Sequence, residues 1–179
     1  PRTIAASGVQ VRLDRRLSES LGDLGLDMSA FDLAAFSHMH FDHVGSAREL
    51  QGATFLTSRP EYDAAFADSI TVPLFNPLYY SALRDADHIM VEDDYDVFGD
   101  GRVRILAAPG HTPGHQVLFI ELQETGPVLL AGDLYFFAVS RELRRVPTFN
   151  VDAAQTRRTM DRIESVLTET GAQLWIEHD

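Results

Sequence analysis

Residues 37–45 read Ser-His-Met-His-Phe-Asp-His-Val-Gly and bring four metal-ligating side chains close together in the chain. In an extended segment His38 and His40 project to the same side, and Asp42 and His43 come from the turn that follows. Imidazole and carboxylate groups together suit Zn²⁺, and also Fe or Mn, whereas Ca²⁺ and Mg²⁺ prefer shells made of oxygen alone. The stretch therefore predicts a transition-metal site.

Three further segments carry side chains of the same kind, and each comes just after a candidate strand. Residues 109–115 read Pro-Gly-His-Thr-Pro-Gly-His, residues 132–133 are Gly-Asp, and residues 177–178 are Glu-His. The carboxyl ends of strands in an α/β sheet converge on one crevice. We therefore expect these groups to meet in space with those of residues 37–45.

Strands and helices alternate along the chain, which predicts an α/β fold. Apolar runs bounded by turn residues predict strands over 33–36, 54–57, 89–91, 103–107, 117–122, 128–131 and 174–176. Helical spacing of apolar residues predicts helices over 17–24, from Ser58 to about Phe66, and from Asn150 or Asp152 to Gly171. Ser58 and Glu61 match the capping-box pattern. Residues 68–87 are rich in proline and aromatic side chains, which favours a lid or substrate wall, with a packed surface excursion as the alternative.

Composition excludes several classes of function. The chain has 179 residues and a net charge of −12, which argues against nucleic acid or an anionic membrane as a partner. It contains no Cys, which excludes disulfide scaffolds and thiolate chemistry, and all 15 of its basic residues are Arg, which excludes Schiff-base and Walker-type lysines. No signal-peptide or membrane-spanning pattern is visible, so the default expectation is a cytoplasmic protein.

The order and spacing of these motifs resemble the metallo-β-lactamase superfamily. The wording of residues 109–116 and the helix that leads to Ile-Glu-His-Asp at 176–179 are most similar to its N-acyl homoserine lactonase branch. The resemblance implies one domain over residues 1–179, built as a four-layer αβ/βα sandwich with a two-metal site along one edge of the sheets. Only 37 residues precede His38, so we expect outer strands of the family fold to be missing at the chain ends.

The resemblance also assigns roles to individual residues. One metal ion would be bound by His38, His40 and His111, the other by Asp42, His43 and His178, and Asp133 would bridge both. The ions would be two divalent metals, with Zn²⁺ favoured and Fe, Mn or Co as alternatives. A carboxylate shared by two cations reduces their repulsion, and a hydroxide bridging them would attack the substrate.

Asp42 and Tyr135 are the expected catalytic residues. Asp42 would orient the hydroxide and pass its proton to the leaving oxygen. Lactonases commonly carry a Tyr three residues after the bridging Asp, but that position is Phe136 here and a tyrosine stands one residue earlier. For His115, support of the ligands and structural packing are equally open roles. We expect Ser37 and Thr112 to orient ligands by hydrogen bonds and His88 to be structural. The candidates for an acyl-chain channel are Leu74, Phe75, Leu78, Tyr79 and Phe136.

The sequence thus predicts a metal-dependent hydrolase that opens a lactone such as an N-acyl homoserine lactone. Its partner would be a small-molecule ester or lactone, not nucleic acid or a membrane, and a homodimer is allowed. Phosphotriester, thioester or β-lactam hydrolysis are alternatives, as is a truncated relative that binds metal without catalysis. The arginines that would favour a β-lactam carboxylate are Arg84, Arg141, Arg144 and Arg145.

Overall fold

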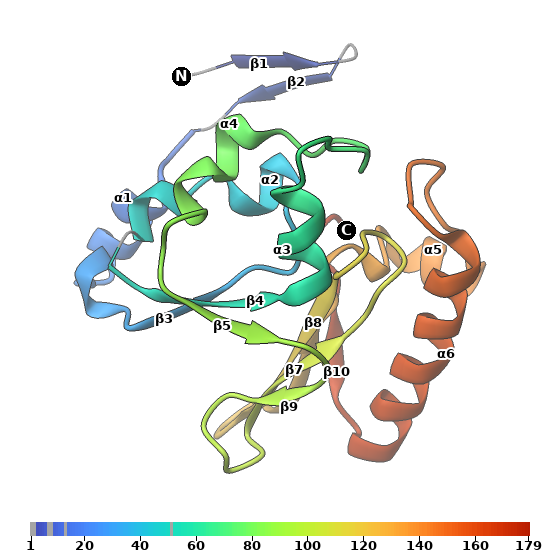
Figure 1. The fold of residues 1–179 in the computed structure, drawn as a ribbon. Coiled ribbons are helices and arrows are strands. Elements are labelled where there is room, and N and C mark those ends of the chain that lie inside the picture. Colours follow the sequence, from blue (N-terminus) through green and yellow to red (C-terminus); the bar gives the residue numbers. More distant parts are fainter. Residues whose placement is uncertain (1–2, 7–8, 13, 51) are drawn as a thin grey trace.

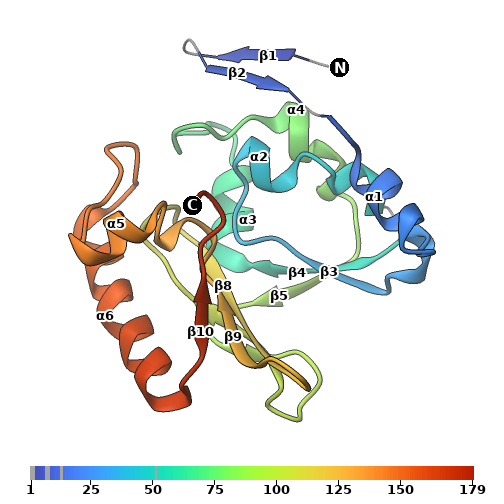
Figure 2. The ribbon, with the colours of Figure 1, turned by 180° about the vertical axis from the view of Figure 1, so that it is seen from behind.

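The structure, a computed structural model, describes residues 3–6, 9–12, 14–50 and 52–179. Two β-sheets pack against each other and helices cover their outer faces, so the layers run helix, sheet, sheet, helix (Figures 1 and 2). The predicted α/β sandwich is therefore confirmed. A hairpin of β1 (Thr3–Ala6) and β2 (Val9–Arg12) precedes the first helix, α1 (Leu17–Asp23). Among the described residues, no helix combines the length and apolar character that a membrane crossing requires.

The first sheet contains three parallel strands in the order β3, β4, β5. They lie where the apolar runs predict them, at Leu33–Ala35, Thr54–Ser58 and His88–Val91. The helices over its outer face are α2 (Phe41–Val44), α3 (Arg59–Ala65) and α4 (Pro77–Tyr80) (Figure 1). An apolar cluster joins these helices to the sheet, and it consists of Met39, Val44, Ala47, Phe55, Ala65, Phe75, Tyr80 and Leu83.

The second sheet contains five strands in the order β10, β9, β8, β7, β6. In chain order they are β6 (Tyr95–Asp96), β7 (Val103–Ala107), β8 (Gln116–Leu122), β9 (Gly126–Leu130) and β10 (Gln173–Trp175). All neighbours are antiparallel except β9 and β10, which are parallel. The short helix α5 (Ala138–Glu142) and the long helix α6 (Ala153–Thr170) flank this sheet. Met160, Ile163 and Leu167 of α6 are buried in the cluster beneath it, as their spacing predicts.

The two sheets meet through a third apolar cluster that includes Leu56, Val91 and Ile105. The removal of each such side chain from water stabilises the packed sheets by about 1.5–3 kcal/mol. This packing brings together the carboxyl ends of β3, β7, β9 and β10. The segments with ligand-type side chains follow these four strands, so they emerge at one edge of the stack (Figure 2).

Several local expectations differ from the structure. Residues 68–87 contain α4 and a 3₁₀ turn at Ser81–Leu83. Helix α1 forms as predicted and stops before Gly25, which has a φ of 73°, but it buries none of its residues and Leu24 is 74% exposed. Strand β6 and helix α5 are too short to leave a periodic pattern. The N-cap of α6 is Asp152, whose Oδ1 accepts a hydrogen bond from Gln155 N at 2.8 Å.

The predicted capping box at the start of α3 is wrong. Ser58 occupies the N-cap position but makes no side-chain capping hydrogen bond. Glu61 is buried, and its carboxylate accepts hydrogen bonds from the backbone of two distant segments instead. A capping box and the observed arrangement have the same residue types at the same spacing. They differ only in the distant backbone groups that Glu61 contacts.

Candidate metal centre

The first group of convergent side chains contains three buried imidazoles and one buried carboxylate, from His38, His40, His111 and Asp133. His38 Nε2 lies 2.8 Å from His40 Nδ1 and 3.2 Å from His111 Nε2. His40 Nδ1 and His111 Nε2 are 3.1 Å apart. Two nitrogens bound to one tetrahedral Zn²⁺ at about 2.0–2.1 Å would be about 3.4 Å apart. The three nitrogens are therefore spaced much like ligands around one ion.

The far nitrogens of these rings have protein partners that determine where their lone pairs point. His40 Nε2 donates to Pro73 O at 3.0 Å, and His111 Nδ1 donates to Asn150 Oδ1 at 3.0 Å. In a neutral imidazole the other nitrogen then carries a lone pair. His40 Nδ1 and His111 Nε2 thus face each other as two acceptors without a proton between them. Such an arrangement is unfavourable unless a cation binds both, so the donor set fits a metal ion.

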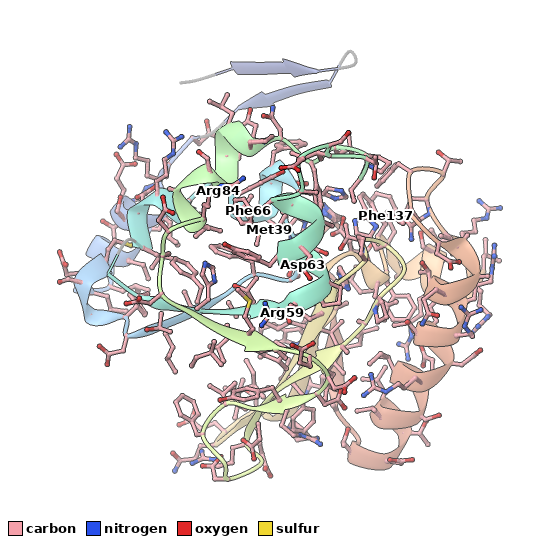
Figure 3. All side chains as sticks on the ribbon, in the orientation of Figure 1. Met39, Arg59, Asp63, Phe66, Arg84 and Phe137 are labelled. Atoms are coloured by element: carbon pink, nitrogen blue, oxygen red, sulfur yellow. The ribbon has the colours of Figure 1, made fainter. Side chains whose placement is uncertain are left out.

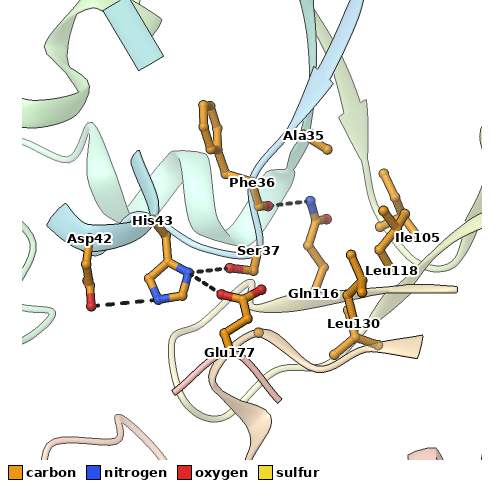
Figure 4. A pocket seen from close by; sticks show the side chains of 12 residues that line it. Ala35, Phe36, Ser37, Asp42, His43, Ile105, Gln116, Leu118, Leu130 and Glu177 are labelled. Atoms are coloured by element: carbon orange, nitrogen blue, oxygen red, sulfur yellow. Dashed lines mark hydrogen bonds and ion pairs between the residues drawn. The ribbon is translucent and has the colours of Figure 1, made fainter. Parts of the chain in front are cut away.

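The second group contains Asp42, His43 and His178, and it is more exposed than the first. Asp42 and His43 lie in α2, which begins directly after His40, and His178 follows β10. Their ligand atoms lie within 4.8 Å of one another. Figure 4 shows the His43 ring between the side chains of Asp42 and Ser37. His43 Nε2 is buried, and its nearest charged neighbours are the carboxylate oxygens of Asp133 at 3.1 Å and of Asp42 at 3.9 Å.

Asp133 stands between the two groups and offers one oxygen to each. Its Oδ2 lies 3.2 Å from His111 Nε2 and 3.8 Å from His38 Nε2. Its Oδ1 lies 3.1 Å from His43 Nε2 and 3.1 Å from His178 Nε2. The carboxylate thus has the placement of a bridge between two ligand sets.

Burial and charge set the protonation of these side chains. Burial lowers the pKa of His38 well below its usual value, and burial lowers the pKa of His40 to about 4. Both rings are therefore neutral near pH 7 and able to ligate a metal. Burial raises the pKa of Asp133, but interactions with His111 and His43 outweigh it and hold that pKa well below its usual range. Burial lowers the pKa of His43, whereas the neighbouring Asp133 carboxylate raises it and prevails.

His115 supports the bridging carboxylate and is not one of the convergent ligands. Its Nδ1 donates to Ala108 O at 3.1 Å, so its Nε2 accepts the Asp133 N–H at 3.0 Å. Gly132, with a φ of 48°, passes so close that a Cβ there would lie 2.7 Å from His115 Nε2. His115 therefore positions the backbone that presents Asp133. Outer hydrogen bonds of this kind orient metal ligands in proteins.

Ser37 and Thr112, both expected to orient ligands, differ in what they contact. Ser37 Oγ lies 3.1 Å from His38 Nδ1 and 3.0 Å from His43 Nδ1, so one hydroxyl links the two groups. Thr112 is completely buried, but among the described residues its hydroxyl forms no hydrogen bond with any of the ligand-type side chains. His88 Nε2 donates to Leu83 O at 2.6 Å, and His88 is not one of the convergent ligand residues. This contact agrees with the structural role expected for it.

Tyr135, expected to act in catalysis, is not brought to the cluster. It is 1% exposed, packs in the core under α6, and donates through its hydroxyl to Glu164 Oε1 at 2.7 Å. The same carboxylate accepts two hydrogen bonds from Arg141. The one-residue offset from the lactonase pattern thus turns the phenol toward helix α6, and the next residue, Phe136, faces the site instead.

Aromatic rings form a wall beside the cluster. The ring of Phe136 stacks on that of His178, with centroids 4.4 Å apart and an interplanar angle of 11°. Phe75 lies edge-on to His40 at 5.6 Å, and Phe149 lies edge-on to His111 at 5.7 Å. Of the other channel candidates, Leu74 and Leu78 are 49% and 65% exposed, and Tyr79 packs near Phe41.

Sequence reasoning missed Phe149 as a wall residue and Asn150 as the partner of His111. The structure places both there because backbone hydrogen bonds join Val151 N to His111 O and Asp152 N to Gly110 O. These bonds dock the start of α6 on the 109–115 turn. From the sequence, Asn150 was one of two candidates for the helix cap. That pattern predicts a capping role and not a contact with His111.

A cleft of about 300 Å³ opens beneath the second group, between the two sheets (Figure 4). Asp42, His43 and Glu177 line its polar end. Its apolar end is lined by Ile105, Leu118 and Leu130, which lie side by side on β7, β8 and β9. The second group therefore borders open space through Asp42 and His43.

The relatives found by comparison with known proteins include several N-acyl homoserine lactonases. The N-acyl homoserine lactonase AttM of Azorhizobium caulinodans is 31% identical over 163 residues, which are 87% of this chain and 61% of the relative. The N-acyl homoserine lactonase AiiA of Bacillus thuringiensis subsp. kurstaki is 31% identical over 145 residues, 80% of this chain and 54% of the relative. This chain therefore spans about three fifths or less of the length of these two relatives.

The fold has a similar counterpart among solved structures. An N-acyl homoserine lactone hydrolase, with the product N-hexanoyl-L-homoserine bound at its catalytic metal centre, matches with a TM-score of 0.80 and 28% identity. The match covers 92% of this chain and 62% of that one. The sequence profile described as the Metallo-beta-lactamase superfamily matches residues 7–170. Fold, motif order and profile agree, and the chain belongs to the metallo-beta-lactamase superfamily.

Proposed function

We propose that this protein is a metal-dependent hydrolase that opens the ring of a lactone, with an N-acyl homoserine lactone as the favoured substrate class. The observation that carries the proposal is the placement of Asp133, which directs one oxygen to each of two ligand groups. The proposed metals are two divalent ions, with Zn²⁺ favoured because the donors are imidazoles and carboxylates. His38, His40 and His111 would hold one ion, Asp42, His43 and His178 the other, and Asp133 both.

Bound divalent ions would polarise the lactone carbonyl and lower the pKa of a water molecule. In the overall reaction, water adds to the carbonyl carbon, the ring C–O bond breaks, and a proton reaches the released oxygen. Asp42 is suited to move that proton, because its side chain is 38% exposed and it borders the open cleft. The buried Asp133, in contrast, is surrounded by imidazoles and serves to hold the two groups at a constant separation.

An apolar surface beside the cluster suits the acyl chain of such a substrate. The Phe136 ring stacks on the His178 ring. The centroid of the Phe137 ring lies 5.7 Å from that of Phe136, and Phe137 is 43% exposed. Phe149 continues the same surface toward His111. An alkyl chain lying on these rings would lose contact with water, which favours binding by about 0.8 kcal/mol per buried CH₂ group.

Three of the four arginines that would hold a β-lactam carboxylate are engaged elsewhere. Arg141 forms two hydrogen bonds of 2.7 Å with Glu164, and Arg144 pairs with Asp161 at 2.7 Å. Arg84 lies over the ring of Phe66, 4.8 Å from its centroid (Figure 3). Arg145 is exposed and is the remaining candidate. These contacts favour a lactone over a β-lactam as substrate.

A parallel assay on the metal-loaded protein tests the proposal. We expect kcat/KM to be highest for a long-chain N-acyl homoserine lactone, lower for a phosphotriester and lowest for a cephalosporin, since the site has an apolar wall and Arg84, Arg141 and Arg144 are engaged elsewhere. A phosphotriester as the best substrate would overturn the lactonase assignment and leave a metal-dependent hydrolase. Full metal content without turnover of any of the three would favour a metal-binding domain without catalytic activity.

Replacement of Asn150 with Ala is expected to weaken metal binding to the first group by roughly 10–100-fold, the usual effect of losing a hydrogen bond that orients a ligand. The change removes the acceptor of the His111 Nδ1–H and leaves the ring free to rotate. Competition with a chromogenic chelator measures the affinity. Asn76→Ala is a matched control, because Asn76 Oδ1 caps α4 and contacts none of the ligand groups. Equal metal affinity in the two variants would show that Asn150 does not orient the ring.

A further inference from the structure

Glu61 is a buried carboxylate that the proposed reaction does not use. It lies in the first turn of α3 and is 2% exposed. Transfer of a carboxylate out of water is unfavourable unless strong hydrogen bonds or a cation compensate for it. No ion pair among the described residues includes Glu61, so hydrogen bonds must provide the compensation.

The two oxygens of Glu61 bind two different segments of the chain. Oε1 accepts a hydrogen bond from Met39 N at 2.8 Å, and Oε2 accepts one from Gly114 N at 2.9 Å. Met39 stands between His38 and His40, and Gly114 is in the turn that carries His111. One side chain therefore joins the two segments that supply all three histidines of the first group. Both oxygens of this buried carboxyl group are thereby paired with backbone N–H groups.

The contact between α3 and the 109–115 turn is built for close approach. Gly114 has no side chain, and a Cβ there would lie 2.3 Å from the backbone N of Glu61 and 2.3 Å from Ser58 Oγ. The side chain of Met39 is buried in the apolar cluster beneath the helices, and Phe66 at the end of α3 packs against that cluster (Figure 3). The segment around Met39 and the 109–115 turn therefore both pack against α3, and the Glu61 carboxyl group lies between them.

A second link between these segments lies on the side of the strands. Gln116 N donates to Ser37 O at 2.9 Å, and Gln116 Nε2 donates to Phe36 O at 2.9 Å. These bonds align the end of β3 with the start of β8, before the first ligand. Beyond that point, the peptide between His38 and His40 is held to the His111 turn through Glu61.

We propose that Glu61 is a positioning residue that holds the two histidine segments at the separation metal binding requires. The inference rests on the proposed metal centre and extends it to a residue that touches neither metal nor substrate. The second group comes from α2 and from the segment after β10. We therefore expect Glu61 to position mainly the three histidines of the first group.

The test compares Co²⁺ binding by the whole chain and by Glu61→Gln, followed by the visible absorption of the bound ion and by competition with a chelator. Glutamine has nearly the same shape, but its NH₂ group would face a backbone N–H and one of the two links would be lost. We expect roughly 10–100-fold weaker Co²⁺ binding and an altered absorption band. Ala65→Gly is the matched control, since it destabilises α3 without touching either link.

The outcomes separate the inference from the proposed function. Tighter Co²⁺ binding by the unaltered chain and by Ala65→Gly than by Glu61→Gln supports the positioning role. Equal affinity and equal spectra for Glu61→Gln and Ala65→Gly overturn that role and leave the metal centre intact. A lack of Co²⁺ binding by the unaltered chain overturns the metal centre and the inference together. If Glu61→Gln does not fold, Glu61→Asp, one methylene shorter and unable to reach both N–H groups, is measured in the same way.

Discussion

Replacement of Asp133 with Asn is expected to release one of the two metal ions and to lower kcat/KM for the lactone at least about a hundredfold, because even residues that only orient ligands affect activity 10–100-fold. The amide keeps the volume of the side chain but loses its negative charge, and only one of its two outer atoms can bind a metal. One ligand group would therefore lose its shared donor, and the two proposed cations would lose the charge between them. Metal content per chain and kcat/KM are the measurements.

Asp161→Asn provides the matched control for this substitution. Asp161 lies on α6, where it pairs with Arg144 at the surface, 2.7 Å away. A surface pair of this kind contributes at most about 1 kcal/mol, so metal content and activity are expected to stay at the level of the unaltered chain. Retention of two ions per chain by Asp133→Asn would contradict the bridging role.

Removal of metal by a chelator is expected to lower the melting temperature by about 10 °C. A ligand at a thousand times its Kd stabilises a protein by about 4 kcal/mol, and each kcal/mol corresponds to about 2–4 °C for a chain of this size. Without a cation, the acceptor nitrogens of His40 and His111 would face each other at 3.1 Å. Differential scanning calorimetry with and without chelator measures the shift.

The double variant His38→Ala with His111→Ala provides the control for chelation, since it lacks two of the three imidazoles in the first group. Chelator is expected to shift its melting temperature much less than that of the unaltered chain, since little metal would be bound to remove. Identical melting curves for the unaltered chain with and without chelator would show that metal binding and folding are not coupled.

Much of the fold was predictable because the apolar runs are short and clearly bounded. The strands at 33–36, 54–57 and 103–107 appear at these positions within one residue. The convergence of His38 and His111 followed from one rule, that strand ends in an α/β fold meet at one edge. Local sequence thus indicated both the elements and the edge at which they meet.

Other features depend on partners that are distant in the chain. Glu61 fits a capping box by residue type and spacing, but its carboxylate accepts hydrogen bonds from Met39 N and Gly114 N. Asn150 was considered only as a helix cap, but the docking of α6 on the 109–115 turn gives its side chain to His111. The direction of Tyr135 depended on a single position along an extended segment, where neighbouring side chains point to opposite faces.

The division of the ligands between the two sheets has a consequence for the kinetics of folding. His38, His40 and His43 belong to the first sheet's half of the chain, and His111, Asp133 and His178 to the second. No ion can collect both sets until the sheets have docked, so we expect ligation to be complete only after the transition state for folding. Interactions absent from the transition state slow unfolding without accelerating folding. Metal would therefore extend the lifetime of the folded chain and leave its speed of formation nearly unchanged.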